Sequence, residues 1–174
     1  MHVTLQSRLS PSLLYLGWLI YKNLPPTRFF ALKRWLLRWG GVEIAEDVRI
    51  VSSVRIAFNG SLSIGRSTWV GHDALFIGGS DSVIQIGNCC DIGPRVSFIA
   101  GTHEIDPNGA HAAGVPLSES ISIGDGVWLC ASVTILGDTV LGENCVVAAG
   151  AVVRGSFPAK SLIGGVPARL IRRL

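Results

Sequence analysis

One histidine stands out as a residue able to do chemistry. His103 lies in the run Gly-Thr-His-Glu, directly before the segment 104–122, which carries no repeat pattern. Imidazole changes its protonation state near neutral pH, so this side chain can accept or release a proton during a reaction. A long insertion in a regular chain is more often functional than accidental, which favours a role for His103. His72 and His111 lack that context, and a surface role is the simpler interpretation for both.

The elements that must position His103 follow from a hexapeptide repeat. Residues 123–157 divide into six-residue units that open with Ile, Leu or Val and carry a small or compact residue at the fifth position. Phe157 is the one large residue at that fifth position. A period of six with Gly after the aliphatic residue predicts a parallel β-helix, in which short strands wind around a prism and stack their side chains in columns. The 48% hydrophobic and 16% charged content fits the continuous aliphatic interior of such a solenoid.

The same units, counted back from residue 123, predict five triangular coils that begin at Ile44. The extra residues fall between coils, at 62–63, 82–85 and 104–122, so every interruption maps to one corner of the prism. An accidental repeat would be interrupted anywhere. The restriction to one corner therefore supports a triangular all-β solenoid.

The register of these coils brings distant side chains together. Residues one coil apart stack roughly 4.8 Å from each other, as neighbouring strands do. The count predicts that Asp81 and His103 lie one above the other at one corner. It also predicts that Asp91 lies directly under Trp128 at a different corner. For Asp81 two interpretations stay open, a contact to substrate or to His103, and a solvated corner residue.

The sequence divides into three parts. Residues 41–158 form the expected β-helix domain, with the loop 104–122 inserted in it. Residues 1–40 precede the repeat and predict a helical cap or a membrane-surface segment. Residues 159–174 predict one last strand and a short basic helix that seals the second end.

Two helices are expected before the repeat. The first runs over Leu13–Lys22 after the entry sequence Ser10-Pro11-Ser12, and Thr27 caps the second, which ends at Trp39. One interpretation is a cap over the open end of the solenoid, because a stack of repeats must be covered at its ends. The other is an interfacial helix with its apolar side chains in lipid and its Lys and Arg side chains at the head groups. The two interpretations are compatible.

Composition and cysteine usage narrow the function further. The net charge of +3 is too small to argue for nucleic-acid binding. The four cysteines, at positions 89, 90, 130 and 145, show neither metal-ligand spacing nor an extracellular disulfide framework, which predicts reduced thiols and a cytoplasmic protein. The apolar run 13–21 is too short to span a bilayer and has no cleavage site after it. We expect a cytoplasmic protein, with peripheral contact to the inner face of the membrane through residues 10–40 as an open alternative.

Several stretches together carry a family resemblance. They read IGDGVWLCASVTIL from residue 123, LGENCVVAAGAVV from residue 141 and GGVPARLIR from residue 164. Around His103 the sequence reads NCCDIGPRV and then GTHEIDP. Residues 41–172 thus resemble the left-handed β-helix, hexapeptide-repeat acyltransferases, and most of all their sugar and polysaccharide O-acetyltransferase branch.

The resemblance implies an activity and an assembly. It implies a homotrimer with active sites between subunits, acetyl-CoA as co-substrate, no required metal, and a sugar or glycan hydroxyl as acceptor, as in capsule, O-antigen or exopolysaccharide synthesis. His103 would be the general base that takes the proton from the attacking hydroxyl. Because a thioester is already activated, no covalent enzyme intermediate is needed.

The resemblance also implies residues for acetyl-CoA. The backbone N–H of Ala131 would meet the acetyl end, as an oxyanion donor, and the backbone of Ala149 would hold the pantetheine arm. Trp128 would form a wall of the thioester or acceptor pocket. Arg169 and Arg172 would bind the CoA phosphates, since the planar guanidinium donates two parallel hydrogen bonds.

One departure from the family pattern affects the nucleotide contacts. The family often has Thr-Lys-Asp where this chain has Arg154-Gly155-Ser156, so the usual Lys is absent. Arg154 or Lys160 would take over its contact.

On the acceptor side, the resemblance implies a set of carboxylates. Asp81 stands where sugar acetyltransferases use a carboxylate to hold an acceptor hydroxyl, and Asp73 stands where they have an Asn. Asp91 and Glu104 are further candidates for contacts to substrate.

Other functions stay open at this point. A carbonic-anhydrase-like zinc enzyme shares the coil but needs three converging histidines, which the spacing of His103 and His111 does not favour. N-acetylation of an amino sugar, acetylation of serine, and a non-catalytic scaffold are the remaining alternatives.

Overall fold

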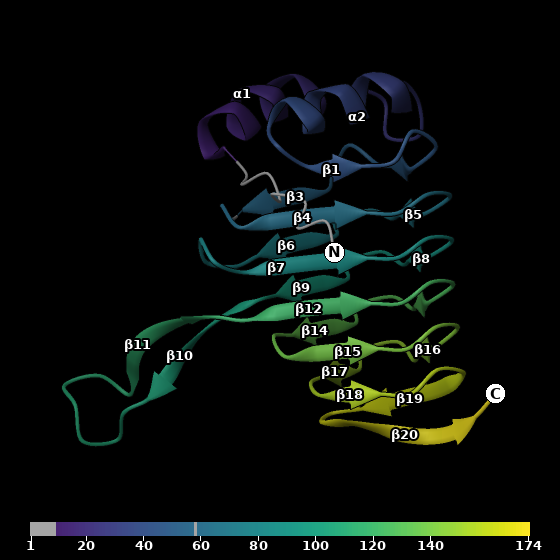
Figure 1. Ribbon diagram of the computed structural model, residues 1–174. Coiled ribbons are helices and arrows are strands. Elements are labelled where there is room, and N and C mark those ends of the chain that lie inside the picture. The colour runs from purple at the N-terminus through teal and green to yellow at the C-terminus, as the bar shows by residue number, and fades with distance from the viewer. Residues whose placement is uncertain (1–9, 58) are drawn as a thin grey trace, which may run out of the picture.

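Three parallel sheets form a triangular prism, and two helices lie across one end of it (Figure 1). The computed structural model describes residues 10–57 and 59–174. The helices are α1, Pro11–Tyr21, and α2, Phe30–Trp39.

Each sheet collects one strand from every coil. Sheet A contains β1 (Glu43–Ile44), β4 (Ser61–Ile64), β7 (Val83–Ile86), β12 (Ser120–Ile123), β15 (Thr139–Leu141) and β18 (Ser156–Phe157). Sheet B contains β2 (Arg49–Ile50), β5 (Trp69–Val70), β8 (Asp91–Ile92), β13 (Trp128–Leu129), β16 (Val146–Val147), β19 (Ser161–Gly165) and β20 (Ala168–Arg173). Sheet C contains β3 (Arg55–Ala57), β6 (Leu75–Ile77), β9 (Ser97–Ile99), β14 (Thr134–Leu136) and β17 (Val152–Val153). A separate hairpin consists of β10 (Gly101–Ile105) and β11 (Ala113–Ser118).

The strand register confirms five stacked coils. Ile44, Ile64, Ile86, Ile123 and Leu141 pair in succession along sheet A, and each of them opens a unit of the predicted repeat. The connections that differ in length from coil to coil all join sheet C to sheet A, so the predicted corner is confirmed, although residues 62–63 and 83–85, which we counted as extra, lie in β4 and β7. The two other corners keep the same length in coil after coil, so sheets A, B and C stay in step.

The end of the repeat departs from the count made on the sequence. Phe157 pairs with Leu141, which it follows by 16 residues, whereas Leu141 follows its own partner Ile123 by 18 residues. Phe157 therefore opens a sixth, partial coil, and our placement of it at a fifth position is wrong. Gly155, with a φ of 99°, makes the shortened corner that the sequence count did not include.

The interior of the prism is a continuous apolar column. Apolar side chains enter it at alternate strand positions, which is the periodicity of a strand with one buried face. Phe76 and Phe98 stack one coil apart, with ring centroids 4.8 Å apart and planes 3° from parallel. Cys90 and Cys145 are fully buried in the same interior, and burial raises the pKa of the Cys90 thiol to about 11.

The second end of the prism is closed by a hairpin. We predicted a strand and a helix over residues 159–174, and the helix is wrong, because β20 turns back and pairs antiparallel with β19. Gly165 adopts a φ of 101° at the turn. The antiparallel strand satisfies backbone groups at the last edge of sheet B, which a helix would leave unpaired.

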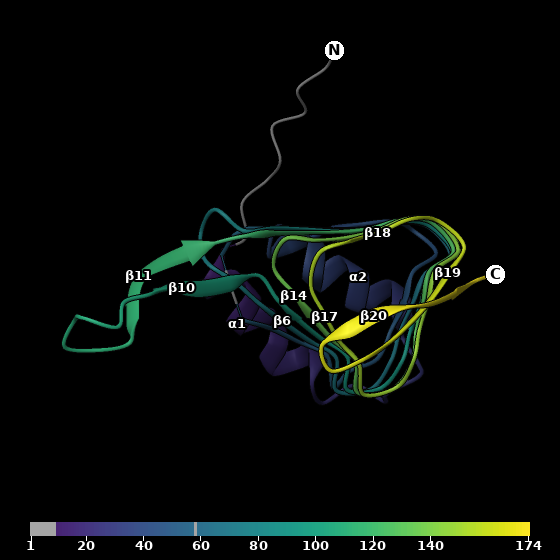
Figure 2. The same cartoon turned by 90° about the horizontal axis from the view of Figure 1, so that it is seen from below.

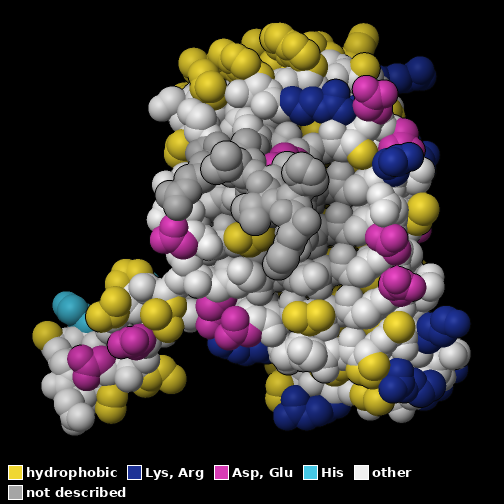
Figure 3. Space-filling model, in the orientation of Figure 1, with side chains coloured by type: hydrophobic (Ala, Val, Ile, Leu, Met, Phe, Trp, Pro, Cys, Tyr) yellow, Lys and Arg dark blue, Asp and Glu magenta, His cyan; other side chains and the backbone are white. Residues whose placement is uncertain are grey.

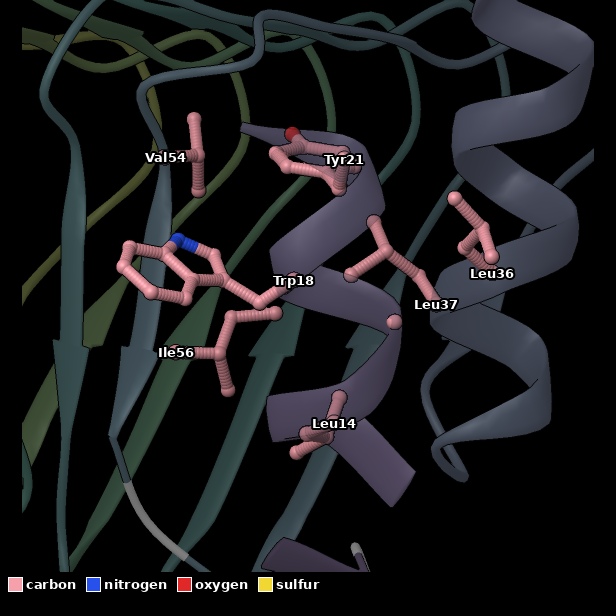
Figure 4. Close-up of a pocket in the computed structure, with 8 residues that line it drawn as sticks. Leu14, Trp18, Tyr21, Leu36, Leu37, Val54 and Ile56 are labelled. Carbon is pink, nitrogen blue, oxygen red and sulfur yellow. The ribbon is translucent and has the colours of Figure 1, made fainter. Parts of the chain in front are cut away.

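The first end is capped by the two helices, as one of the two interpretations predicts. Leu14 and Tyr21 of α1 and Leu36 and Leu37 of α2 are buried and face the first coil (Figure 4). A cavity of only about 20 Å³ remains between the helices and the coil, so the inner surface of the cap is well packed. None of the helices in the described part of the chain is long and apolar enough to cross a bilayer.

Basic side chains of α2 bind backbone carbonyls below the cap. Arg34 donates to the carbonyl of Val48 at 2.8 Å, and Arg38 donates to that of Ile44 at 2.8 and 3.0 Å. These carbonyls belong to the first coil, and no earlier coil lies on its helical side to pair with them. The arginines therefore satisfy the open edge of the solenoid.

The connection between the helices explains why Thr27 is not the cap that we predicted. Lys33 is completely buried, and its ammonium donates to the carbonyl of Pro25 at 2.9 Å and to that of Pro26. These bonds hold the preceding segment as a turn, so that α2 starts later than expected. Phe29 takes the N-cap position in the left-handed conformation, with a φ of 54°, and its side chain makes no cap bond.

The hydroxyl of Tyr21 gives a prediction about alkaline stability. Tyr21 is buried and donates to the carbonyl of Val51, and burial raises its pKa. Above pH 10 the unfolded chain loses the phenolic proton and the folded chain keeps it, so the contribution of Tyr21 to the free energy of unfolding falls by about 1.4 kcal/mol per pH unit. Below pH 10 this contribution to stability is fully present. The Tyr21→Phe variant should lack this decline, which urea unfolding between pH 8 and pH 11 would measure.

The other tyrosine supplies the control for this measurement. Tyr15 is exposed, so Tyr15→Phe should unfold with the pH dependence of the unmodified protein. At pH 7, Tyr21→Phe should be less stable by about 0.5–1.5 kcal/mol, because the carbonyl of Val51 loses one of its two donors and keeps the N–H of Val54 at 3.3 Å. An alkaline decline of equal steepness in all three proteins would contradict the role assigned to Tyr21.

Candidate functional site

The long insertion forms an arm that carries His103. The arm, residues 101–118, consists of β10 and β11 and projects away from the prism at the corner between sheets C and A (Figures 1 and 2). Its base is closed by a hydrogen bond of 2.7 Å from the N–H of Glu119 to the carbonyl of Ala100. Its tip is held by Asp106, whose carboxylate accepts the N–H groups of Asn108 and Gly109 at 3.1 and 2.9 Å. The insertion is therefore an ordered hairpin.

The hydrogen bond made by His103 fixes the state of its ring. Its Nδ1 lies 2.9 Å from the carbonyl oxygen of Gly114, on the facing strand of the arm. A carbonyl oxygen can only accept, so Nδ1 must carry the proton. In the neutral ring Nε2 is then unprotonated and faces outward from this bond with a free lone pair. The arrangement is that of a base whose tautomer is fixed by the backbone.

The stacking of His103 over Asp81 is not what the structure shows. The parallel ladder between the second and third coils ends at Ile77 and Ile99, and beyond it the chain turns into the arm. His103 pairs with Pro116 across the hairpin. Asp81 stays in the corner turn of the second coil, so the two residues share a corner but not a column. The sequence count could not detect this, because it assumes that the coil continues to residue 103.

Trp128 and Asp91 do stack as predicted. They pair between β8 and β13, and Trp69 is the next residue in the same outward-facing column of sheet B. Trp128 is 53% exposed, so most of its indole is available to a ligand or a neighbouring subunit. Asp91 is exposed between the two indoles.

Ala131 and Ala149 occupy one column at the corner between sheets B and C. The column follows from the pairing of Leu129 with Val147, two residues earlier in each coil. Among the described residues, no acceptor takes the N–H of Ala131 or of Ala149. Pro94 holds the same position in the third coil and has no N–H at all. The fold therefore does not require these N–H groups, which are free to bind a ligand.

A glycine makes room beneath the first of these N–H groups. A Cβ built on Gly93 would lie 3.0 Å from the nitrogen of Ala131 and 2.7 Å from the carbonyl oxygen of Leu129. Only a residue without a side chain fits there.

The remaining acceptor candidates lie at separate places. Asp73 is at the corner between sheets B and C, with a φ of 58°, and its N–H donates to the hydroxyl of Ser53 at 2.9 Å. His72 lies beside it, with Nδ1 3.5 Å from the same hydroxyl. Glu104 is exposed on the arm, next to His103. Of these candidates, only Glu104 and Asp81 share a corner with His103.

The basic candidates separate into two groups. Arg169 and Arg172 lie on β20 and Lys160 directly precedes β19, at the end of the prism away from the helices, where Figure 3 shows basic side chains gathered. None of these three forms an ion pair with a described residue. Arg154 is elsewhere, at the corner between sheets C and A, where it binds Glu119 at 2.6 Å and Asp138 at 3.2 Å. These bonds fasten the base of the arm to the next coil.

An open groove of about 660 Å³ leads toward the base of the arm. It begins at Tyr15 and Trp18 of α1 and continues past Arg55 and Asn59 to Gly78. Gly78 lies against Gly101, the first residue of the arm. A Cβ added to Gly101 would be 3.4 Å from the Cα of Gly78. Reasoning from the sequence missed this groove and the carbonyl of Gly114, because neither produces a motif.

The fold and the site together define a class, the parallel β-helices that display a base on an inserted arm. A family profile described as "Bacterial transferase hexapeptide (six repeats)" matches residues 120–155. The colanic acid biosynthesis acetyltransferase WcaF of Escherichia coli, itself described as putative, is 30% identical over 148 residues, which are 84% of this chain and 78% of that protein. The chain belongs to the hexapeptide-repeat acetyltransferase family.

Two further matches bear on the fold and on the extent of the chain. The structure of hexapeptide-repeat acetyltransferase VCA0836 of Vibrio cholerae, complexed with acetyl coenzyme A, matches with a TM-score of 0.70 and 25% identity, over 94% of this chain and 86% of that one. This match supports the left-handed β-helix that the resemblance implies. A putative acetyltransferase of Schizosaccharomyces pombe is 32% identical over 66% of this chain but only 54% of its own length. The chain thus spans about half of that relative.

Proposed function

We propose that this protein is an acetyl-CoA-dependent O-acetyltransferase that acts on a sugar hydroxyl in the synthesis of a surface polysaccharide. The observation that carries the proposal is the fixed tautomer of His103, whose Nδ1–H is bound to Gly114 and whose Nε2 is free to accept a proton. Support for the donor comes from the complex of the Vibrio cholerae relative with acetyl coenzyme A. Support for the acceptor class comes from WcaF, whose name places it in colanic acid biosynthesis.

In the proposed reaction, His103 acts as the general base. Nε2 takes the proton from the acceptor hydroxyl as its oxygen attacks the thioester carbonyl carbon. The N–H of Ala131 donates to the oxyanion of the tetrahedral intermediate. The carbon–sulfur bond then breaks, and the proton held on Nε2 passes to the leaving thiolate. The N–H of Ala149 and the indole of Trp128 hold the rest of the donor.

One chain does not bring these groups together, which supports a homotrimer with shared sites. Ala131 precedes β14 and is level with Pro94, whereas the arm starts at Gly101, beyond the far end of the paired strand β9, roughly 23 Å away along extended chain at 3.3 Å per residue. The arm carries His103 still farther out (Figure 2). Ile105 and Val115 on the arm are 87% and 62% exposed, which favours an arm that covers a neighbouring subunit. We propose that His103 of one subunit works with Ala131 of the next.

The experiment that tests the function is a transfer assay with the purified full chain. Release of CoA thiol from acetyl-CoA would be followed with galactosides, acidic oligosaccharides, amino sugars and serine as acceptors, and products identified by mass spectrometry. Acceptor-dependent release with an acetyl ester on the sugar is the expected result. An amide product would instead establish N-acetylation, and no release with any acceptor, despite CoA binding, would favour the scaffold.

The basic end of the prism gives a prediction about CoA affinity. If Arg172 binds a phosphate of CoA, Arg172→Ala should raise the Kd by about 10–100-fold, the loss of one hydrogen bond to a charged group. Arg154→Ala is the matched control, because its guanidinium is already held by Glu119 and Asp138 and should change the Kd less than about twofold. Titration calorimetry with CoA measures both. A larger rise in the Kd for Arg154→Ala than for Arg172→Ala would instead indicate that Arg154 binds the nucleotide.

A further inference from the structure

The outer surface of the two helices is apolar and uncovered. Helix α1 carries no charged residue, and its apolar side chains surround its whole circumference, although only one side packs on the prism. A helix of this kind is normally buried or in contact with lipid. Eight large side chains of the helical end are 38–60% exposed, and we call them the cap face. The cap face consists of Tyr15, Leu16, Leu19, Ile20, Phe29, Leu32, Trp35 and Trp39.

The fold does not need the cap face. The opposite sides of α1 and α2 already bury Leu14, Tyr21, Leu36 and Leu37 against the first coil (Figure 4). Monomeric proteins rarely keep so large a continuous apolar surface unless something covers it. Phe29 holds a left-handed backbone conformation that is unfavourable for a large residue, while its ring is 59% exposed. The described residues therefore do not account for the exposure of these side chains.

The shape of the cap face suits a plane. Both helices lie across the end of the prism (Figure 1), and hydrophobic side chains form a level row along that end (Figure 3). A flat surface can touch this row along its whole length. Trp and Tyr, which the cap face contains, are favoured at the boundary between lipid head groups and acyl chains.

The charges of the cap favour an anionic surface. The sequence has no Asp or Glu before Glu43. Arg34 and Arg38 bind carbonyls of the first coil, and Lys33 binds carbonyls of the turn between the helices, so our expectation that the basic side chains of α2 would meet the head groups is wrong. Lys22 and Arg28 remain exposed beside the cap face, and Lys22 lies over the ring of Trp18 at 4.4 Å.

We propose that the cap face is a docking surface for an anionic lipid bilayer. The exposed apolar side chains enter the head-group region, Lys22 and Arg28 bind anionic lipid, and the prism stands on the membrane by its helical end. The groove from Tyr15 to the base of the arm then opens at the membrane surface. A second copy of the chain is a poorer occupant, because a symmetric contact would bring the same cations together without an acid to pair them.

Vesicle binding tests the proposal. The full chain would be mixed with vesicles of pure phosphatidylcholine and with vesicles containing 30% phosphatidylglycerol, and the bound fraction measured by co-sedimentation. Binding to the anionic vesicles is expected. The double variant Leu19→Glu/Trp35→Glu should bind at least 10-fold more weakly, and Lys22→Ala and Arg28→Ala should each bind about fivefold more weakly to the anionic vesicles alone.

Controls keep the result interpretable. Both residues of the double variant are exposed, so its circular dichroism and unfolding transition should match those of the unmodified protein. Ile171→Glu changes an exposed apolar residue of β20 at the opposite end of the prism and should bind vesicles normally. Equal vesicle binding by the double variant, or loss of binding in Ile171→Glu instead, would overturn the proposal. The proposal would also be overturned if the double variant bound vesicles like the unmodified protein but differed from it in oligomeric state in solution. A second copy of the chain would then be the occupant of the cap face.

Discussion

Replacing His103 by alanine is expected to lower the rate of acetyl transfer by about 10²–10⁴-fold, the usual contribution of a general base. The affinity for CoA should stay unchanged, because the side chain is on the arm and the proposed nucleotide contacts are on β19 and β20. Thiol release at saturating acetyl-CoA measures the rate, and calorimetry measures the affinity. The variant should fold normally, since His103 is exposed and makes a single hydrogen bond.

The arm provides the matched control. His111 is exposed near its tip, so His111→Ala removes an imidazole from the same insertion. It should transfer acetyl groups at close to the unmodified rate. If His103→Ala kept that rate with its true acceptor, the mechanism proposed for the arm would have to be abandoned, whatever the state of CoA binding.

Replacing Ala131 by proline is the second large effect that we expect. Proline removes the backbone N–H, and loss of one oxyanion donor lowers turnover by about 10²–10³-fold. A strand or tight corner rarely accepts proline, but here Pro94 occupies the equivalent position in the preceding coil. No described residue uses the N–H of Ala131, so the chain itself loses no hydrogen bond.

Ala131→Gly is the control, because it changes the side chain and keeps the N–H. It should retain most of the turnover, and both variants should show the unfolding midpoint of the unmodified protein to within a few degrees. A proline variant that folds and turns over normally would show that the oxyanion donor is elsewhere. A proline variant that fails to bind CoA would instead place this N–H in ground-state binding.

Much of the fold could be predicted from the sequence, because a solenoid repeats one local rule. Ile64, Ile86 and Ile123 follow each other in space because each opens a unit, and no other information is needed to place them. The same count places Asp91 under Trp128. It fails where the repeat changes length, as at Phe157, and where the chain leaves the coil, as at His103.

The site is less predictable because its geometry comes from irregular backbone. The bond from His103 to the carbonyl of Gly114 depends on the register of a hairpin whose strands have no repeat. The ion pairs of Arg154 depend on a corner that is shortened by Gly155. Likewise, the inward bonds of Arg34 and Arg38 arise from unpaired carbonyls at the edge of the first coil, and a helical pattern does not report such carbonyls.

The closed base of the arm separates the residues proposed to meet the acceptor from the residues that stabilise the fold. Ala100 and Glu119 are joined by a backbone hydrogen bond, so the coil below the arm and the coil above it meet without help from residues 101–118. The length and sequence of this hairpin can therefore vary while the rest of the prism keeps its strand pairing and its proposed CoA contacts. Exchanging hairpins between relatives at these two residues would be a route to altered acceptor choice at little cost in folding stability.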